Sequence, residues 1–194
     1  MSDKIKVLGI AGSLREGSYN RAALRAAKEL APEGMEIEIF DIAGLPGFNQ
    51  DQEADPPEQV ADLKRRVREA DAVVLVTPEY NYSISGVLKN AIDWASRPYG
   101  DSAWEGKPAA IMGASGGAIA TARAQYDLRK MMVFLNMFPL NRPEVMIGNA
   151  GEKFDESGNL TDEQTRKFIS DQMQALLEWT RKLKAGEAKK DAAA

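Results

Sequence analysis

IKVLGIAGSLREGSYNRAALRAAKEL, residues 5–30, holds an apolar run, a polar loop and an alanine-rich run in direct succession. The apolar run predicts a strand over 6–10, and the alanine-rich run predicts a helix over 20–30. The loop at 12–20 carries three hydroxyl side chains, an asparagine, an arginine and two glycines. A strand, a loop and a helix in this order begin a β-α-β unit, so the stretch indicates a parallel sheet.

The same alternation of short apolar runs and helical patterns continues along the chain. Further strands are predicted at 35–40, 72–77, 107–114 and 144–147, and further helices at 58–69, 85–96, 121–137 and 161–183. Threonine and glutamine in TDEQ, residues 161–164, resemble a capping box at the start of the last helix. The predicted fold class is α/β: a doubly wound five-stranded parallel sheet with helices on both faces.

The chain of 194 residues is long enough for one well-packed domain. No internal repeat or linker divides it, so we predict a single domain over 1–183. Residues 184–194, KAGEAKKDAAA, lack large apolar side chains, and a disordered C-terminal tail is expected there.

Charge and hydropathy narrow the range of partners. The formal net charge is −4, and no stripe of lysine and arginine offsets it, so no nucleic-acid partner is expected. The cluster KRR at 64–66 is interpreted as the solvated face of a helix. There is no apolar run of about 20 residues and no signal-peptide pattern, so we expect no membrane partner and a cytoplasmic location.

Two residue types are missing from the sequence, cysteine and histidine. Their absence excludes disulfides, thiolate nucleophiles, Ser-His-Asp catalysis and most transition-metal sites, so no metal is expected. If the protein is an enzyme, a bound cofactor carries the chemistry.

Three loops of unusual composition follow predicted strands: GSLREGSYN at 12–20, PEYNYSISG at 78–86 and ASGGAIA at 114–120. Ligands of an open parallel sheet bind beyond the carboxyl ends of its strands, so these loops are expected to share one site. Neither G-x-x-x-x-G-K-[ST] nor G-x-G-x-x-G is present, which disfavours an ATPase or a dinucleotide-binding Rossmann site.

The first loop ends where a helix begins, and the free N–H groups and dipole of a helix start favour an anion. Ser13, Arg15, Ser18 and Asn20 can donate hydrogen bonds, and the two glycines permit close backbone approach. This inventory suits a phosphate monoester; a capped helix start with incidental serines is the alternative. The aromatic and amide groups of the second loop suit a flat heteroaromatic ring, or else they pack against the next helix.

Several motifs together are similar to one known family. They are G-S-L-R-x-x-S-x-N at 12–20, PEYNYS at 78–83 and LKNAIDW at 88–94, and the similarity continues through 122–129 and 141–144. The chain resembles the NAD(P)H-dependent FMN reductases, and within them the bacterial chromate and quinone reductases. The resemblance implies a flavodoxin-like fold, non-covalently bound FMN, NAD(P)H as co-substrate and a homodimer or homotetramer.

The resemblance also implies the residues that bind FMN. They are Ser13, Leu14, Arg15, Gly17, Ser18, Tyr19 and Asn20 around the phosphate, Pro78, Glu79, Tyr80, Asn81 and Tyr82 beside the isoalloxazine, largely through main-chain groups, and Ser115, Gly116 and Gly117 near the ring and ribityl chain. Two departures from the family pattern concern the loops. Ser85 replaces a frequent proline and can cap the following helix, and Ala120-Thr121 replaces a common glycine pair.

The implied activity is electron transfer from NAD(P)H through FMN to small acceptors, namely quinones, chromate, free flavins or azo dyes, in a ping-pong order. The flavin carries the chemistry, so no catalytic side chain is assigned. The alternatives are a flavodoxin-like electron carrier that serves protein partners, and a nucleotide-binding regulator without flavin.

Two further features have open interpretations. Arg97 either contacts anionic substrates or complements the dipole at the end of a helix. The apolar segment MMVFL at 131–135 indicates either a subunit interface or packing on the sheet alone.

Overall fold

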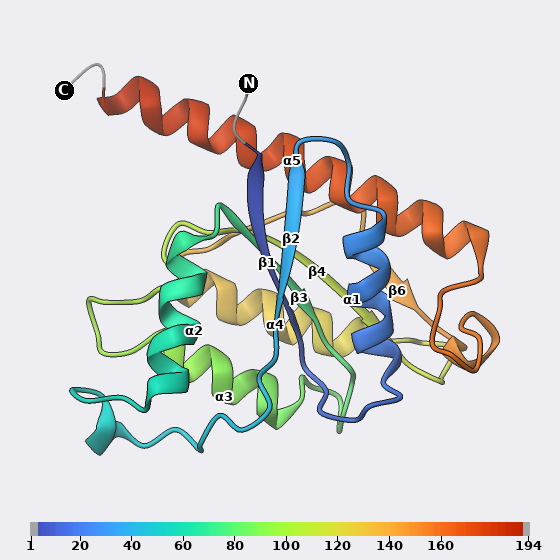
Figure 1. The fold of residues 1–194 in the computed structure, drawn as a ribbon, viewed down its shortest axis with the longest axis horizontal. Coiled ribbons are helices and arrows are strands. Elements are labelled where there is room, and N and C mark those ends of the chain that lie inside the picture. Colours follow the sequence, from blue (N-terminus) through green and yellow to red (C-terminus); the bar gives the residue numbers. More distant parts are fainter. Residues whose placement is uncertain (1–3, 192–194) are drawn as a thin grey trace.

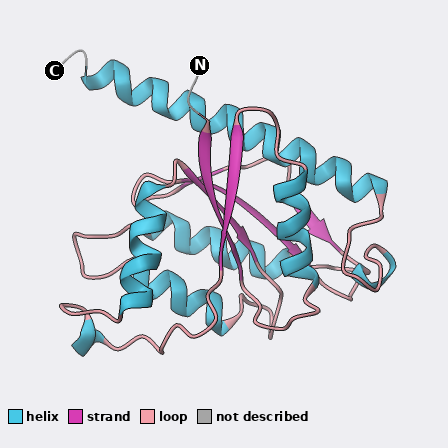
Figure 2. Cartoon of the chain, in the orientation of Figure 1, coloured by secondary structure: helices cyan, strands magenta, loops and turns pink. Residues whose placement is uncertain are grey.

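The computed structural model describes residues 4–191, and its centre is a parallel sheet made from the apolar runs (Figures 1 and 2). Its principal strands are β1 (Ile5–Ala11), β2 (Met35–Phe40), β3 (Ala72–Val76) and β4 (Pro108–Ala114). The spatial order is β2-β1-β3-β4-β5, the flavodoxin-like arrangement. All residues of β3 and β4 are buried, as expected for strands covered on both faces.

The fifth position of the sheet is occupied by two short strands, β5 (Phe138–Pro139) and β6 (Val145–Ile147). β5 pairs with the start of β4 and β6 with its end, so only the second piece matches the predicted strand. The Gln172 side chain spans the gap between them, donating to the carbonyls of Ile111 at 3.0 Å and Pro143 at 2.8 Å. A side chain thus supplies hydrogen bonds where the ladder is interrupted.

Helices cover both faces of the sheet, which confirms the doubly wound prediction. They are α1 (Tyr19–Glu29), α2 (Glu58–Glu69), α3 (Gly86–Ala95), α4 (Ala122–Phe134) and α5 (Glu163–Asp191). Apolar side chains of α1 and α5 share one buried cluster with the strands, and those of α2, α3 and α4 share the other. None of the helices in the described part of the chain combines the length and apolar character that a membrane span requires.

The last helix differs from its prediction at both ends. Its cap is Asp162, which accepts from the Thr165 backbone N–H at 2.8 Å, whereas the Thr161 hydroxyl donates to the Lys153 carbonyl. The helix continues to Asp191, whereas the sequence predicts a disordered tail from residue 184. Alanine, lysine and glutamate, which are frequent in this segment, have high helix propensity. Residues 192–194, and 1–3 of the predicted domain, lie outside the described residues.

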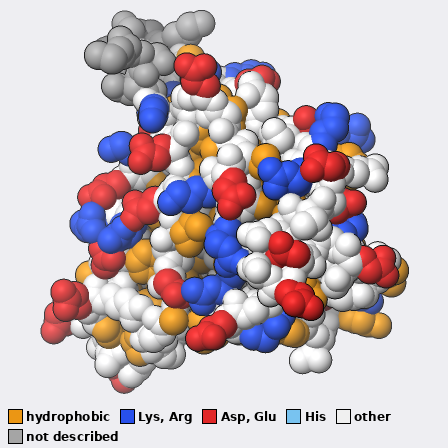
Figure 3. Space-filling model, turned by 45° about the vertical axis from the view of Figure 1, so that its right-hand side comes forward, with side chains coloured by type: hydrophobic (Ala, Val, Ile, Leu, Met, Phe, Trp, Pro, Cys, Tyr) orange, Lys and Arg blue, Asp and Glu red, His pale blue; other side chains and the backbone are white. Residues whose placement is uncertain are grey.

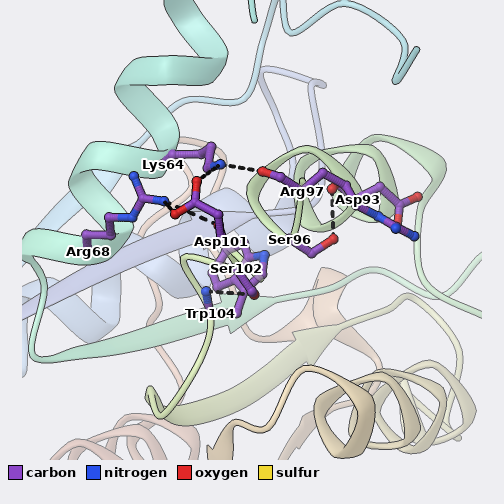
Figure 4. A network of polar contacts seen from close by, with 8 residues as sticks. All are labelled: Lys64, Arg68, Asp93, Ser96, Arg97, Asp101, Ser102 and Trp104. Atoms are coloured by element: carbon purple, nitrogen blue, oxygen red, sulfur yellow. Dashed lines mark hydrogen bonds and ion pairs between the residues drawn. The ribbon is translucent and has the colours of Figure 1, made fainter. Parts of the chain in front are cut away.

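The prediction of a solvated face at 64–66 is wrong for Lys64, which is only 7% exposed. Its Nζ donates to the Arg97 carbonyl and to Asp101 Oδ2, the latter at 2.9 Å, and Arg68 Nη2 donates to Asp101 Oδ1 at 2.6 Å (Figure 4). This network joins α2 to the loop that follows α3. On the face shown in Figure 3, acidic and basic side chains lie interspersed.

Candidate active site

The three loops predicted to share a site lie at the carboxyl edge of the sheet (Figure 1). After β1 the chain enters α1 on one face, and after the neighbouring β3 it enters α3 on the other. Crevices open where adjacent strands send their connections to opposite faces, and in this strand order the β1/β3 junction is the binding point for FMN in flavodoxins. The topology therefore places the first two loops beside that junction.

The first loop closes on the start of α1. Ser18 is the cap of this helix: its Oγ accepts from the backbone N–H of Asn20 at 3.2 Å and of Arg21 at 3.4 Å. The Ser18 N–H donates to the Arg15 carbonyl at 3.1 Å, while the Arg15 side chain is exposed. A hydroxyl that accepts these bonds still has its own hydrogen to donate. Helix cap and anion donor are thus compatible roles for the same serine.

Glycine is required where this loop meets α3. A Cβ at Gly12 would lie 2.9 Å from Ser85 Oγ and 3.0 Å from Leu88 Cβ. Ser13 beside it is buried, Leu14 is 45% exposed and Gly17 is exposed near the Arg15 guanidinium. The loop therefore packs tightly at its start and is open at its tip.

Two residues predicted at the phosphate, Tyr19 and Asn20, make structural contacts. Asn20 is buried, and its Nδ2 donates to the Ala114 carbonyl at 2.9 Å while its Oδ1 accepts from the Ala114 N–H at 2.8 Å. Tyr19 is half-buried and packs on Phe154, with ring centroids 5.4 Å apart. The asparagine side chain thus ties the start of α1 to the end of β4.

The second loop contains a β-hairpin with a two-residue turn. Tyr80 and Ser83 exchange two backbone hydrogen bonds of 3.0 Å, and the residues between them, Asn81 and Tyr82, have φ of +52° and +67°. Positive φ at both central residues is the type I′ turn. The hairpin presents the exposed rings of Tyr80 and Tyr82, while Pro78 is buried at its base.

The hairpin is followed by α3, which Ser85 caps by accepting from the Leu88 N–H at 3.3 Å. The expectation that serine can cap this helix in place of proline is confirmed.

Glu79 connects the second loop to α4. Its side chain is only 6% exposed and accepts from the backbone N–H groups of Arg123 at 3.0 Å and Ala124 at 3.2 Å. The Arg123 guanidinium bonds the same carboxylate at 2.5 Å and lies 3.9 Å from the centroid of the Tyr82 ring. Sequence reasoning missed Arg123; its place in the first turn after the third loop is the signal that could have identified it.

The third loop leaves β4 and turns sharply before α4. The Ser115 N–H donates to the Ile147 carbonyl at 2.9 Å, and Ser115 Oγ accepts from Gly117 N–H at 3.2 Å. Gly116 is exposed, with open space where a Cβ would be. Ala120 has φ of +56°, so alanine holds a left-handed conformation where the family commonly has glycine.

Two hollows flank the second loop. One of ≈ 590 Å³ lies between the second and third loops and is lined by Glu79, Asn81, Tyr82, Ser115, Gly117, Ala118, Ile119, Ala120 and Arg123. The other, of ≈ 400 Å³, lies between the first and second loops and is lined by Gly12, Ser13, Leu14, Arg15, Tyr80, Ser85, Gly86 and Val87.

Arg97 lies outside both hollows. It lies two residues after Ala95, the last residue of α3, whereas Ser85 at the first end of that helix lines a hollow. A ten-residue helix is about 15 Å long, so α3 separates Arg97 from the hollow at the first end of this helix in the same chain, and a contact with substrate stays a prediction. Its guanidinium instead lies 4.0 Å from the centroid of the Tyr99 ring.

Comparisons with known proteins agree with this arrangement. The family model of the NADPH-dependent FMN reductases matches residues 5–152. The chain is 56% identical to an NAD(P)H-dependent FMN reductase of Pseudomonas aeruginosa, covering 95% of this chain and 100% of that protein. It is 44% identical to a 2-hydroxy-1,4-benzoquinone reductase of a Burkholderia species, covering 91% and 97%.

Among solved structures, the FerB flavoenzyme NAD(P)H:(acceptor) oxidoreductase of Paracoccus denitrificans matches with a TM-score of 0.84 and 40% identity, over 92% of this chain and 98% of that one. An archaeal flavodoxin at 10% identity, with a TM-score of 0.62, shows the shared fold alone. The chain belongs to the NADPH-dependent FMN reductase family.

Proposed function

We propose that this protein is an FMN-dependent NAD(P)H oxidoreductase that delivers electrons to small acceptors, with quinones as the main class. The observation that carries the proposal is that an anion-suited helix start after β1 and an open hollow between the loops after β3 and β4 lie at the same carboxyl edge of a flavodoxin-like sheet. When bound, FMN supplies the redox chemistry by taking hydride from NAD(P)H and passing two electrons on.

The first loop fits the phosphate of FMN. The helix dipole favours an anion at the start of α1, the Ser18 hydroxyl there retains its hydrogen, and the exposed Arg15 can bind a phosphate through its guanidinium fork. Ser13 adds a further hydroxyl. Asn20 holds the start of α1 in place for this phosphate site, because both groups of its side-chain amide bind the Ala114 backbone.

The hollow of ≈ 590 Å³ fits the isoalloxazine ring. Its walls are the Tyr82 side of the hairpin and the small residues of the third loop, where Ser115 and Gly117 leave room for close backbone approach. The hollow is open, so a ring bound in it would stay accessible to a donor and then to an acceptor, as the ping-pong order requires.

The acceptor class rests on the relatives. The Burkholderia protein is a benzoquinone reductase by name, and quinones need no charged pocket to enter an open hollow. Chromate, azo dyes and free flavins stay as secondary acceptors suggested by the family resemblance.

We further propose that the protein is a homodimer or homotetramer. Large apolar side chains are exposed on α4 and just beyond it, namely Tyr126 (56%), Val133 (82%), Phe134 (73%) and Phe138 (37%). Exposed apolar groups gathered in this way are typical of an interaction surface. Light scattering at micromolar concentration should give a multiple of 21.2 kDa, and a monomer mass would contradict the proposal.

The function is tested with purified protein. We expect a yellow protein with a flavin spectrum, NADH- or NADPH-dependent reduction of 1,4-benzoquinone, and parallel double-reciprocal lines when both substrates are varied. A flavin-loaded protein that turns over quinone negligibly would support the electron carrier instead. A colourless protein that takes up no added FMN would exclude both.

The phosphate cradle is tested with Arg15→Ala. Loss of one charged hydrogen-bond donor, worth about 1.5–3 kcal/mol, should weaken FMN retention by roughly 10- to 100-fold with little change in melting temperature. Fluorescence titration of the apoprotein with FMN measures this. Lys28→Ala, at the other end of α1, is the matched control. Equal FMN affinity in both variants would mean that the loop serves only as a helix cap.

A further inference from the structure

The Glu79 carboxylate is buried beside the hollow proposed for the flavin ring, and a buried charge is costly unless it is paired. Glu79 has three partners: the backbone N–H groups of Arg123 and Ala124 and the Arg123 guanidinium. The two N–H groups belong to the first turn of α4, so the positive end of the helix dipole adds to the arginine charge. A negative group is thus neutralised from two sources.

The two members of this pair differ in exposure. The Arg123 side chain is 41% exposed against 6% for Glu79, and it lines the hollow while lying 3.9 Å from the Tyr82 ring centroid. Tyr82 is itself held in a left-handed conformation by the hairpin. The arginine is therefore fixed between a carboxylate and an aromatic face at the wall of the hollow.

A second contact holds the hairpin on α4. The Asp127 carboxylate accepts hydrogen bonds from Lys130 and from the Ser83 side chain, and these lower the pKa of Asp127 below its usual value. Asp127 and Lys130 form their own ion pair at 2.5 Å, so they add little net charge near the hollow. Among the charged residues of α4 and the second loop, Glu79 and Arg123 are the ones that line the hollow.

We propose that Glu79 and Arg123 act as positioning residues whose balanced charges set the reduction potential of the bound flavin. The inference rests on the ring placement proposed above. Reduction adds negative charge to the isoalloxazine, so a net positive neighbour favours the reduced form and a net negative neighbour disfavours it. With both charges present the wall is near neutral, and removing either one exposes the other.

The single variants should therefore act in opposite directions. Glu79→Gln keeps the side-chain size and one acceptor for the α4 N–H groups, but leaves Arg123 uncompensated, so the potential becomes more positive. Arg123→Met leaves the carboxylate with only its backbone partners, so the potential becomes more negative. The double variant should return close to the parent, and Arg123→Lys, which keeps the charge, should stay close to it.

The size of each shift follows from Coulomb's law. One unit charge about 10 Å from the ring, at an effective dielectric constant of ~20, changes the ratio of the dissociation constants of reduced and oxidised FMN on the order of tenfold. For a two-electron couple a tenfold change corresponds to ~30 mV.

The test is a spectroelectrochemical titration of bound FMN in the parent, the two single variants, the double variant and Lys89→Met. Lys89 lies on α3 in an exposed pair with Asp93, so its removal should leave the potential unchanged. Single variants that shift in the same direction, or not at all, while FMN stays bound would overturn the inference and leave the proposed function intact. A parent protein that binds no FMN would instead refute the proposed function.

If Glu79→Gln does not fold, the two Arg123 variants alone test the proposal. A potential lowered in Arg123→Met and retained in Arg123→Lys supports the charge balance, and equal potentials in both contradict it.

Discussion

The two edges of the central sheet are built in opposite ways. At the carboxyl edge, the loops of the candidate site contain Tyr82 and Ala120, the residues other than glycine and asparagine that have positive φ in the described part of the chain. At the amino edge, Lys64, Asp101 and Arg68 form a network of paired charges between α2 and the loop after α3 (Figure 4). Backbone strain at Tyr82 and Ala120 is concentrated beside the site, where Glu79 and Arg123 also form an ion pair, and the network of Lys64, Asp101 and Arg68 lies at the far end of the strands.

This difference indicates that the two edges of the sheet have different roles. A left-handed conformation costs an L-residue about 1–2 kcal/mol, and such strain persists where surrounding contacts enforce it. At the carboxyl edge those contacts are the hairpin bonds of Tyr80 and Ser83 and the stacking of Arg123 on Tyr82. At the amino edge, the network of Lys64, Asp101 and Arg68 ties α2 to the loop after α3. Four substitutions can break or sharpen this comparison.

The largest effect is expected for Gly113→Ala, at the end of β4. An added Cβ would overlap the Thr77 carbonyl oxygen and the Thr121 hydroxyl, both of which begin or end loops of the site. Overpacking against backbone should lower the free energy of unfolding by about 3 kcal/mol or more. Urea unfolding measures this.

Gly47→Ala is the matched control for that substitution. Gly47 lies in the loop after β2, with open space around the position of a Cβ, so its effect should stay within about 0.5 kcal/mol. Equal effects of the two substitutions would mean that the carboxyl edge is not tightly packed.

The site loops could be predicted from the sequence because the strands that precede them are short, apolar and regularly spaced. Parallel strands then bring their carboxyl ends together by topology alone. The capping roles of Ser18 and Ser85 were also accessible, because serine before a helical run is a strong local signal.

Other features depend on tertiary contacts that local patterns do not encode. Asn20 lies in a loop rich in donors, yet its amide turns inward because the Ala114 backbone would otherwise lack partners. Lys64 belongs to a charged cluster, yet the loop after α3 covers it. Arg97 follows a motif of the family, and the length of α3 carries it away from the site in its own chain.

The next largest effect is expected at the amino edge, from Lys64→Met. Methionine fills similar space but leaves the Arg97 carbonyl and Asp101 without the lysine donor. Hydrogen bonds to charged groups contribute about 1.5–3 kcal/mol, so a loss of about 2 kcal/mol in unfolding free energy is expected. FMN affinity should be unchanged, because the network lies outside both hollows.

Arg65→Met is the control on the same helix. Arg65 pairs with Asp62 and Glu69 at the exposed surface, where such pairs contribute roughly 0–1 kcal/mol. If Lys64→Met reduced the free energy of FMN binding as much as the free energy of unfolding, the two edges would not have separate roles.

A smaller and opposite effect is expected for Ala120→Gly. Glycine removes the cost of a left-handed alanine, about 1–2 kcal/mol, but increases the conformational freedom of the unfolded chain, which offsets about 0.4–1 kcal/mol. A net gain of roughly 0.5 kcal/mol in the free energy of unfolding should result. Ala118→Gly, in the same loop, should show no gain, and an equal gain in both would mean that φ at residue 120 stores no strain.

The smallest effect concerns pH and Asp101. The hydrogen bond from Lys64 lowers the pKa of the Asp101 carboxyl, burial opposes the shift, and Arg68 adds to the lowering. Since the folded pKa is below the unfolded value of about 3.9, the stabilisation is fully present above about pH 4 and is lost as the pH falls through the folded pKa. In Asp101→Asn this acid-dependent part is absent. Melting temperatures between pH 3 and 7 should therefore show a parent–variant difference that is constant above about pH 4 and shrinks below it. A difference that stays constant down to pH 3 would mean that the amino edge depends on the shape and hydrogen-bonding capacity of residue 101 rather than on its charge.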